Sequence, residues 1–380
     1  MNAEAIREFA KEEVYPTLAG RYEGREFSRD LWQKMGRAGL FKFLVPKDLG
    51  GFGGRPEELV AAIEAFVAGG QDPGLCLSWI VHLLIHTRVI ASFGTPGQKE
   101  KYLPALISGE RVGALAASEP GTGANPVKMR ARAVRQDGAF RLDARKIFIT
   151  NGPVADVVIV LARTGEQPSK ENISAFVVEA STPGFRCAQR MELGYLNTSP
   201  HGELAFEGCE VPQDCMLGRP GDGHLRISRA VFGWERTLVT SGMAAAFGIL
   251  LDHTASFLGG VQRTGVGGSE AGESRQAMRE ELAWFHVQLE ALREMGRGLA
   301  AEVLRGFELD GRQMERLLFL GGSLNEWWER FVPFFERVSP PRDFPVPILM
   351  NDARILKVNL LLRSVQLGRI ADSMMARRNG

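Results

Sequence analysis

The spacing of apolar residues changes twice along this chain, and the two changes constrain its fold more than any single motif. Up to about residue 112, apolar side chains recur at helical spacing, as in the run from Ile6 to Val14. From 113 to 222 they recur at every second residue, which is typical of strands, and from 223 onward the helical spacing returns. We therefore predict an α+β fold of three parts: an N-terminal helical domain (1–112), a middle β-barrel-like domain (113–222) and a C-terminal helical bundle (223–380).

Local patterns place the main elements within these parts. Apolar runs predict buried strands at 157–162, 173–178 and 202–206, and alternation on both sides of Asp137-Gly138 predicts a hairpin. Ser28 and Thr95 are expected to cap helices. Longer helices are predicted at 56–68, 75–93, 227–257, 276–302, 313–338 and 349–375, with a glycine-rich break between 259 and 272.

Charge and composition exclude several functional classes. The formal net charge of +1 gives no reason to expect binding to nucleic acid. We expect a cytoplasmic protein, because we find no signal peptide and no apolar run long enough to span a bilayer. His82 and His86 have the spacing of a metal pair on a helix, but no third ligand is suggested and we expect no metal site. The cysteines lie at no metal-ligand spacing and are expected to be reduced: Cys76, Cys187, Cys209 and Cys215.

One stretch combines hydroxyls, open backbone and an aromatic ring. A short apolar strand at 114–117 opens into a loop rich in glycine and proline, and Ser118 begins that loop. Thr150 puts a second hydroxyl at the end of a neighbouring strand, with the ring of Phe148 beside it. Such a surface suits a planar, nitrogen-rich ring, because glycines let the backbone approach it closely. Two ordinary strand ends with turn glycines would give the same pattern.

This stretch resembles the flavin-binding core of the acyl-CoA dehydrogenase family, which reads Thr-Glu-Pro-x-Ala-Gly-Ser-Asp and then Lys-x-Trp-Ile-Thr-Asn. The matching residues are Ser118-Glu119-Pro120, Gly123-Ala124-Asn125 and Lys146-Ile147-Phe148-Ile149-Thr150-Asn151. The resemblance extends from about residue 6 to residue 254. In this chain Phe148 replaces the usual tryptophan, and Ala124-Asn125 replaces Ser-Asp.

The resemblance implies FAD as cofactor and assigns residues to the site. The expected flavin contacts are Leu115, Ala117, Ser118, Phe148 and Thr150, and Arg263 of a neighbouring subunit is expected at the adenine end. The expected substrate contacts are Gly123, Ala124, Trp79, Trp234 and Arg236.

The family also needs a carboxylate base, which most members carry in a Glu-Gly-Thr segment near the C-terminus. Aligning 351–355 with the family's Arg-Asp-Ala-Arg-Ile places 360–362, which are all leucine, at that segment. A minority resembling the isovaleryl and long-chain enzymes carries the glutamate on the helix after the β domain, before an arginine. Glu235 stands there, in a Trp-Glu-Arg sequence that also resembles the prolyl-carrier-protein dehydrogenases, and it is the expected base. A solvent-facing Glu235 paired with Arg236 or Arg229 is the other interpretation.

The expected function is FAD-dependent α,β-dehydrogenation of an acyl thioester, carried by CoA or by a carrier protein, in a biosynthetic pathway. Thr198-Ser199-Pro200 resembles members that act on carrier-protein thioesters. Electron-transfer flavoprotein or oxygen would accept the electrons. Two alternatives stay open: flavin-dependent hydroxylation or another oxidation of a carrier-bound intermediate, and a non-catalytic subunit that has lost its own cofactor. A homodimer or homotetramer is expected, because the apolar runs at 348–350 and 360–362 would otherwise be exposed.

Overall fold

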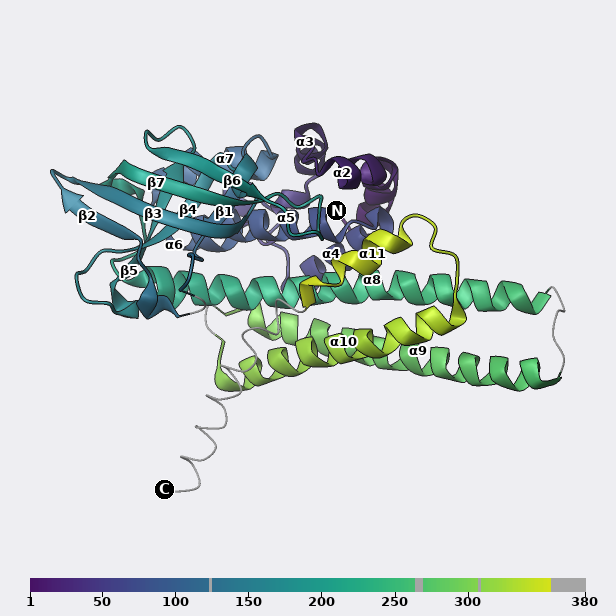
Figure 1. Cartoon of the computed structure of the whole chain (residues 1–380). Coiled ribbons are helices and arrows are strands. Elements are labelled where there is room, and N and C mark those ends of the chain that lie inside the picture. The colour runs from purple at the N-terminus through teal and green to yellow at the C-terminus, as the bar shows by residue number, and fades with distance from the viewer. Residues whose placement is uncertain (123–124, 264–268, 307–308, 357–380) are drawn as a thin grey trace, which may run out of the picture.

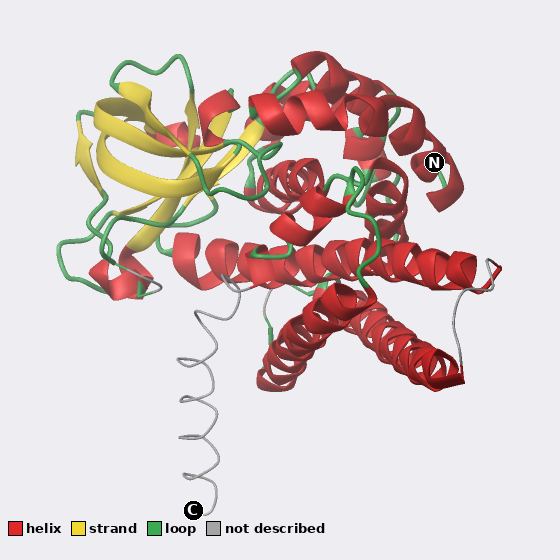
Figure 2. Cartoon of the chain, turned by 45° about the vertical axis from the view of Figure 1, so that its right-hand side comes forward, coloured by secondary structure: helices red, strands yellow, loops and turns green. Residues whose placement is uncertain are grey.

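The computed structural model describes residues 1–122, 125–263, 269–306 and 309–356, and it shows helices, then a sheet, then long helices (Figure 1). Figure 2 shows the sheet on one side of the molecule and the N-terminal helices beside it. One long helix, α8 (Arg229–Arg263), runs along both of these parts and joins them to the last helices. The predicted α+β architecture is therefore confirmed in its main outline.

The N-terminal part consists of short helices around a buried one. Its helices are α1 (Ala3–Phe9), α2 (Leu18–Gly24), α3 (Arg29–Arg37), α4 (Pro56–Gly70), α5 (Pro73–Leu84), α6 (Ala91–Phe93) and α7 (Pro96–Ser108). The Ser28 hydroxyl accepts the Leu31 amide hydrogen, and Thr95 forms a capping box with Gln98, so both predicted caps are confirmed. Every residue of α5 is buried, which explains why its sequence is apolar on all sides.

Two helical stretches have the length and composition of a membrane span, Pro73–Phe93 and Gly223–Gly260. The expectation that the chain has no such stretch was therefore wrong. In the fold, 89% and 72% of their most apolar windows are buried inside the protein. These stretches form the core that the helices and the sheet share.

The middle part is one eight-stranded sheet. Its strands are β1 (Gly113–Ala116), β2 (Arg132–Gln136), β3 (Ala139–Thr150), β4 (Val157–Arg163), β5 (Ile173–Glu179), β6 (Phe185–Met191), β7 (His201–Pro212) and β8 (Met216–Leu217). Along the sheet the order is β6-β7-β3-β2-β4-β5-β8, and β1 pairs with β4 in parallel. β2 and β3 form the predicted hairpin, in which Asp137 and Gly138 both adopt positive φ, as such a two-residue turn requires.

The C-terminal part contains α8, α9 (Ser269–Val303), α10 (Gly311–Val338) and the short α11 (Val346–Asp352). The predicted glycine-rich break is helical at both ends, because Gly259 and Gly260 lie in α8 and α9 begins at Ser269; residues 264–268 lie outside the described part of the chain. Stacked and edge-on aromatic rings, including Phe285, Trp327 and Phe331, fill the space between α9 and α10. Ile348 and Leu349 are buried within the chain, so the predicted exposure of this segment was wrong. The run at 360–362 lies outside the described residues.

Candidate active site

A buried ion pair fixes the chain that follows β1. Lys146 of β3 donates through Nζ to Glu119 Oε1 at 2.8 Å and to the carbonyl oxygen of Ala117 at 3.1 Å. Glu119 also accepts the amide hydrogens of Arg130 and Ala131, at 2.6 and 3.0 Å. Both side chains of the pair are almost fully buried, and burial lowers the pKa of Lys146 to about 8 against the attraction of Glu119. The pair holds the loop after β1 against β3.

The structure brings Ser118, Phe148 and Thr150 together at the ends of β1 and β3. The amide of Ile147 donates to the carbonyl oxygen of Ser118 at 3.0 Å, which places the loop directly beside β3. The pairing of β3 with β7 is irregular between Lys146 and Ile149, and Phe148 lies inside this irregularity with φ of 57°. The bulge therefore interrupts the regular alternation of side chains at Phe148.

This surface fits a flat ring. Phe148 is 54% exposed and has a left-handed backbone, which is costly for a non-glycine residue and occurs often at functional sites. The Ser118 side chain is exposed and Thr150 is half-buried. Leu115 and Ala117, the other expected flavin contacts, are half-buried in the adjoining segment. An exposed aromatic ring therefore lies on this surface with two residues that carry hydroxyl groups.

Asn151 connects this surface to the buried helix α5. It lies directly after Thr150, is fully buried and has φ of 64°. Its side-chain amide donates to the carbonyl oxygens of Ser78 in α5 and Gly113 in β1, at 2.9 and 3.3 Å. The hydroxyl of Ser78 in turn lies 3.0 Å from that of Ser199, on the loop before β7. The end of β3 is thus held at a fixed place against α5.

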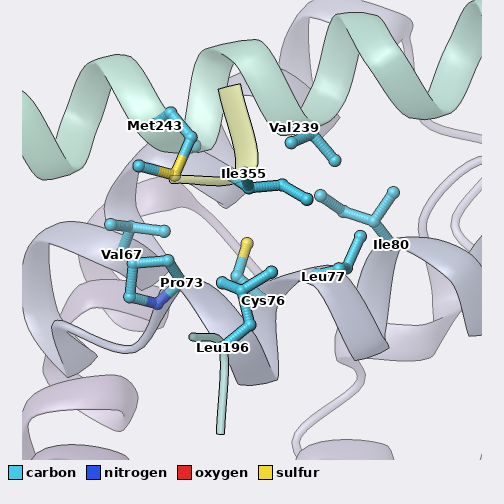
Figure 3. Close-up of a pocket in the computed structure, with 10 residues that line it drawn as sticks. Val67, Pro73, Cys76, Leu77, Ile80, Leu196, Val239, Met243 and Ile355 are labelled. Atoms are coloured by element: carbon cyan, nitrogen blue, oxygen red, sulfur yellow. The ribbon is translucent and has the colours of Figure 1, made fainter. Parts of the chain in front are cut away.

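An apolar pocket lies between α5 and α8, on residues that neighbour Ser78 (Figure 3). The pocket is lined by α5 through Cys76, Leu77 and Ile80, and by α8 through Val239, Gly242 and Met243. Leu196, from the loop before β7, and Ile355, which follows α11, also line it. The side chains that line it are apolar, and they fill most of the space between the two helices.

Glu235 lies on α8 one helical turn before Val239 of the pocket. Its side chain is half-buried, and burial raises its pKa from 4.5 to about 7, with Arg236 opposing the shift. Within the described residues its carboxylate has no hydrogen-bond donor and no ion pair, so the pairing with Arg236 or Arg229 is not formed. Arg236 is itself half-buried, and burial lowers its pKa. The carboxylate is therefore poised to bind a proton near neutral pH.

The structure contradicts the role expected for Trp234. Its indole is 1% exposed and donates to the carbonyl oxygen of Val303 at 2.9 Å, while the Arg88 guanidinium lies 4.0 Å from its ring centroid. Successive residues of a helix point about 100° apart, so Trp234 and Glu235 face different neighbours. Trp234 fixes α8 to the end of α9 and is not among the residues that line the pocket.

Trp79 is also a structural residue rather than a substrate contact. It is fully buried, donates to the carbonyl oxygen of Leu40 at 3.0 Å and packs against Phe66. On the same helix, both ring nitrogens of His82 and of His86 face backbone groups, including the carbonyl oxygens of Leu106 and Phe41 and the amide of Gly113. These rings join core elements to one another.

Other expected site residues lie outside the described part of the chain or far from the site. Gly123 and Ala124 fall in the gap at 123–124, and the leucines that replace the usual base fall beyond residue 356. Arg263 ends α8, and its side chain lies outside the described set. At 1.5 Å per residue it lies about 40 Å along the helix from Glu235. The role expected for Arg263 at the flavin of a neighbouring subunit stays a prediction.

Sequence reasoning missed three residues that shape the site. Glu119, in the loop after β1, and Lys146, in β3, were matched to the motif but given no role. His201 was not singled out; it stands opposite Thr150 in the β3–β7 register. Its signal was a lone histidine at the start of an apolar strand, which does not by itself indicate a partner.

Family models for the acyl-CoA dehydrogenase N-terminal domain and middle domain match residues 1–110 and 114–209. The chain is 31% identical over 363 residues to an acyl-CoA dehydrogenase of Bacillus subtilis, covering 94% of this chain and 93% of the relative. It is 30% identical over 275 residues to the L-prolyl-[peptidyl-carrier protein] dehydrogenase of Pseudomonas fluorescens, covering 72% and 71%. The fold matches the solved structure of PigA with FAD and proline at a TM-score of 0.87 and 24% identity, covering 99% and 97% of the two chains.

The matches extend over both the N-terminal helices and the sheet that carries the Ser118, Phe148 and Thr150 surface. The relative from Bacillus subtilis also covers nearly all of the C-terminal helices that carry Glu235. The chain belongs to the acyl-CoA dehydrogenase family, whose members are oxidoreductases acting on CH–CH bonds.

Proposed function

We propose that this chain catalyses the FAD-dependent α,β-dehydrogenation of an acyl thioester, with Glu235 as the base. The observation that carries the proposal is a half-buried carboxylate with a pKa of about 7 and no ion pair within the described residues, one turn from an apolar pocket. A base must be deprotonated at working pH and strong enough to remove a weakly acidic proton, and this environment provides both conditions.

The site residues fall into two groups, one that would hold the flavin and one that would act on the thioester. Ser118, Phe148 and Thr150 would hold the flavin ring, with Leu115 and Ala117 beside it, and bound FAD supplies a hydride acceptor. Glu235 removes the α-proton of the thioester, and the C–H bond broken at the β-carbon gives up its hydrogen with the bonding electrons, which leaves a carbon–carbon double bond. The pocket between α5 and α8 would orient the acyl group and exclude water from it.

The named relatives support a finer proposal about the substrate. The relative from Pseudomonas fluorescens is named for a prolyl group on a carrier protein, and the neighbouring structure contains FAD and proline. We therefore favour a compact acyl or aminoacyl group on a carrier protein, formed in a biosynthetic pathway, with CoA as the alternative carrier. Electron-transfer flavoprotein or oxygen would reoxidise the flavin.

The test is anaerobic mixing of the FAD-loaded protein with a panel of short acyl-CoA and acyl-carrier-protein thioesters, followed by the flavin absorbance. A substrate should bleach the flavin and give a product lighter by two hydrogen atoms. Glu235→Gln keeps the shape of the side chain and should slow bleaching at least a hundredfold while FAD stays bound. Glu210→Gln, which changes an exposed carboxylate on β7, should have no effect.

Two results would contradict the proposal. Bleaching by Glu235→Gln at the wild-type rate would remove the base, and a purified protein that cannot be loaded with FAD would favour a non-catalytic subunit. A product that gains oxygen, formed only in air, would favour the hydroxylation alternative.

A further inference from the structure

His201 is the partner of Thr150 across the β3–β7 pairing. The two residues are Cα partners in the register, at the end of β3 and the start of β7. The His201 side chain is only 6% exposed, and its Nε2 lies 3.2 Å from Thr150 Oγ1. Its other ring nitrogen, Nδ1, lies 2.8 Å from the carbonyl oxygen of Ser199. The imidazole therefore bridges the loop before β7 and the hydroxyl at the expected flavin surface.

These two contacts determine where the hydrogen atoms lie. A carbonyl oxygen can only accept, so Nδ1 of His201 must carry a hydrogen. Burial lowers the pKa of His201 to about 4, so the ring is neutral at physiological pH and its Nε2 carries none. A bare Nε2 can only accept a hydrogen bond, and Thr150 is its donor. The single hydroxyl hydrogen of Thr150 is thus directed at His201 and away from the ligand surface.

We propose that His201 is a positioning residue that fixes the Thr150 hydroxyl as a hydrogen-bond acceptor toward the flavin and thereby favours the reduced cofactor. The proposal rests on the flavin placement proposed above. With its hydrogen committed to His201, Thr150 can offer only oxygen lone pairs to a ring beside it. Reduction of an isoalloxazine adds hydrogen to ring nitrogens that carry lone pairs when oxidised. An acceptor next to such a nitrogen repels the oxidised ring and binds the reduced one.

The first experiment observes the tautomer directly. The protein is labelled with nitrogen-15 histidine, and the ring nitrogens are followed by NMR from pH 5 to pH 8, with FAD bound. Thr150→Val identifies the His201 signals, because removing the hydroxyl shifts the Nε2 resonance. We expect Nδ1 to be protonated and Nε2 to be bare across this range. A protonated Nε2, or a ring that titrates near pH 6.5, would overturn the proposal.

The second experiment measures the consequence for the flavin by a redox titration against a reference dye with a chemical reductant, in the absence of thioester. His201→Phe releases the Thr150 hydroxyl, so the ratio of reduced to oxidised flavin at a fixed potential should fall about threefold to tenfold, the worth of one hydrogen bond. In a Thr150→Val background the same change should have no further effect. The control is His253→Phe, which alters a histidine bonded to the carbonyl oxygen of Pro341 and should leave the ratio of reduced to oxidised flavin unchanged.

An equal effect of His201→Phe in both backgrounds would show that it does not act through Thr150, and no effect in either would show that Thr150 does not face the ring. Either result overturns the proposal. If His201→Phe does not hold FAD, the NMR measurement decides. Because no thioester is used, failure of thioesters to bleach the flavin contradicts the proposed function alone.

Discussion

The environment of the Glu235 carboxylate raises its pKa to about 7. Burial disfavours the charged form, and Arg236 compensates only in part. A base works in its deprotonated form, so the rate of flavin reduction by a thioester should rise with pH, reach half of its maximum near pH 7 and level off above pH 8. Rapid-mixing measurements of flavin bleaching between pH 5 and pH 9 test this. A rate that is constant over this range, or a midpoint near 4.5, would identify Glu235 as an ordinary surface carboxylate.

The roles expected for two individual tryptophans differ from the places that the structure gives them. The family resemblance assigned Trp79 and Trp234 to the substrate contacts. Both point into the core, where their N–H groups bond to the carbonyl oxygens of Leu40 and Val303. The direction of a side chain on a helix depends on its packing partners, and these come from distant segments. The sequence therefore predicted these two helices but not which face of each one is turned toward the core.

At the scale of elements, the loop after β1 depends on one buried ion pair. Lys146→Met should destabilise the fold by about 3 kcal/mol, because it leaves the buried Glu119 carboxylate with backbone donors but no counter-charge. Arg186→Met removes the cation of the exposed pair with Glu207, between β6 and β7, and should cost at most about 1 kcal/mol. Urea titrations of the two variants give the comparison.

A second readout separates the local role of Lys146 from its contribution to stability. If the pair positions the flavin surface, Lys146→Met should also lower FAD content at temperatures where the protein stays folded. Equal losses of stability in the two variants would mean that the pair is no more important than a surface contact.

Strands and turns with a strong pattern in their own sequence could be predicted. Features that depend on pairing with distant segments could not. The predictions of β4 and β5 were confirmed, because both strands are apolar runs buried along nearly their whole length. The β2–β3 hairpin was also confirmed, because Asp-Gly is a strong turn signal. β6 was missed because it is mostly exposed and its sequence, Phe-Arg-Cys-Ala-Gln-Arg-Met, has no apolar period. The bulge at Phe148 could not be predicted either, because it depends on how β3 pairs with β7.

On the scale of the whole molecule, exposed apolar side chains that favour association lie on α9 and α10, whereas the sequence analysis expected them at 348–350 and 360–362. Trp284 and Val287 on α9 are 55% and 54% exposed and lie three residues apart, on one face of the helix. Phe319 on the neighbouring α10 is 63% exposed. Arg263 lies about 40 Å along α8 from Glu235, and the family resemblance assigns this residue to the flavin of a neighbouring subunit. Both observations favour a homodimer or homotetramer.

We therefore expect the protein to sediment as a dimer or tetramer at micromolar concentration, and Trp284→Glu with Val287→Glu to shift it toward the monomer. Charges placed on an apolar contact lose their hydration when the contact forms, which weakens association. His286→Glu puts the same charge on an exposed position about 200° around α9 from Trp284 and should leave the assembly intact. If Arg263 serves a neighbouring flavin, the dissociated variant should also release FAD more readily than wild type. A wild-type monomer that holds FAD tightly would contradict both the assembly and the shared site.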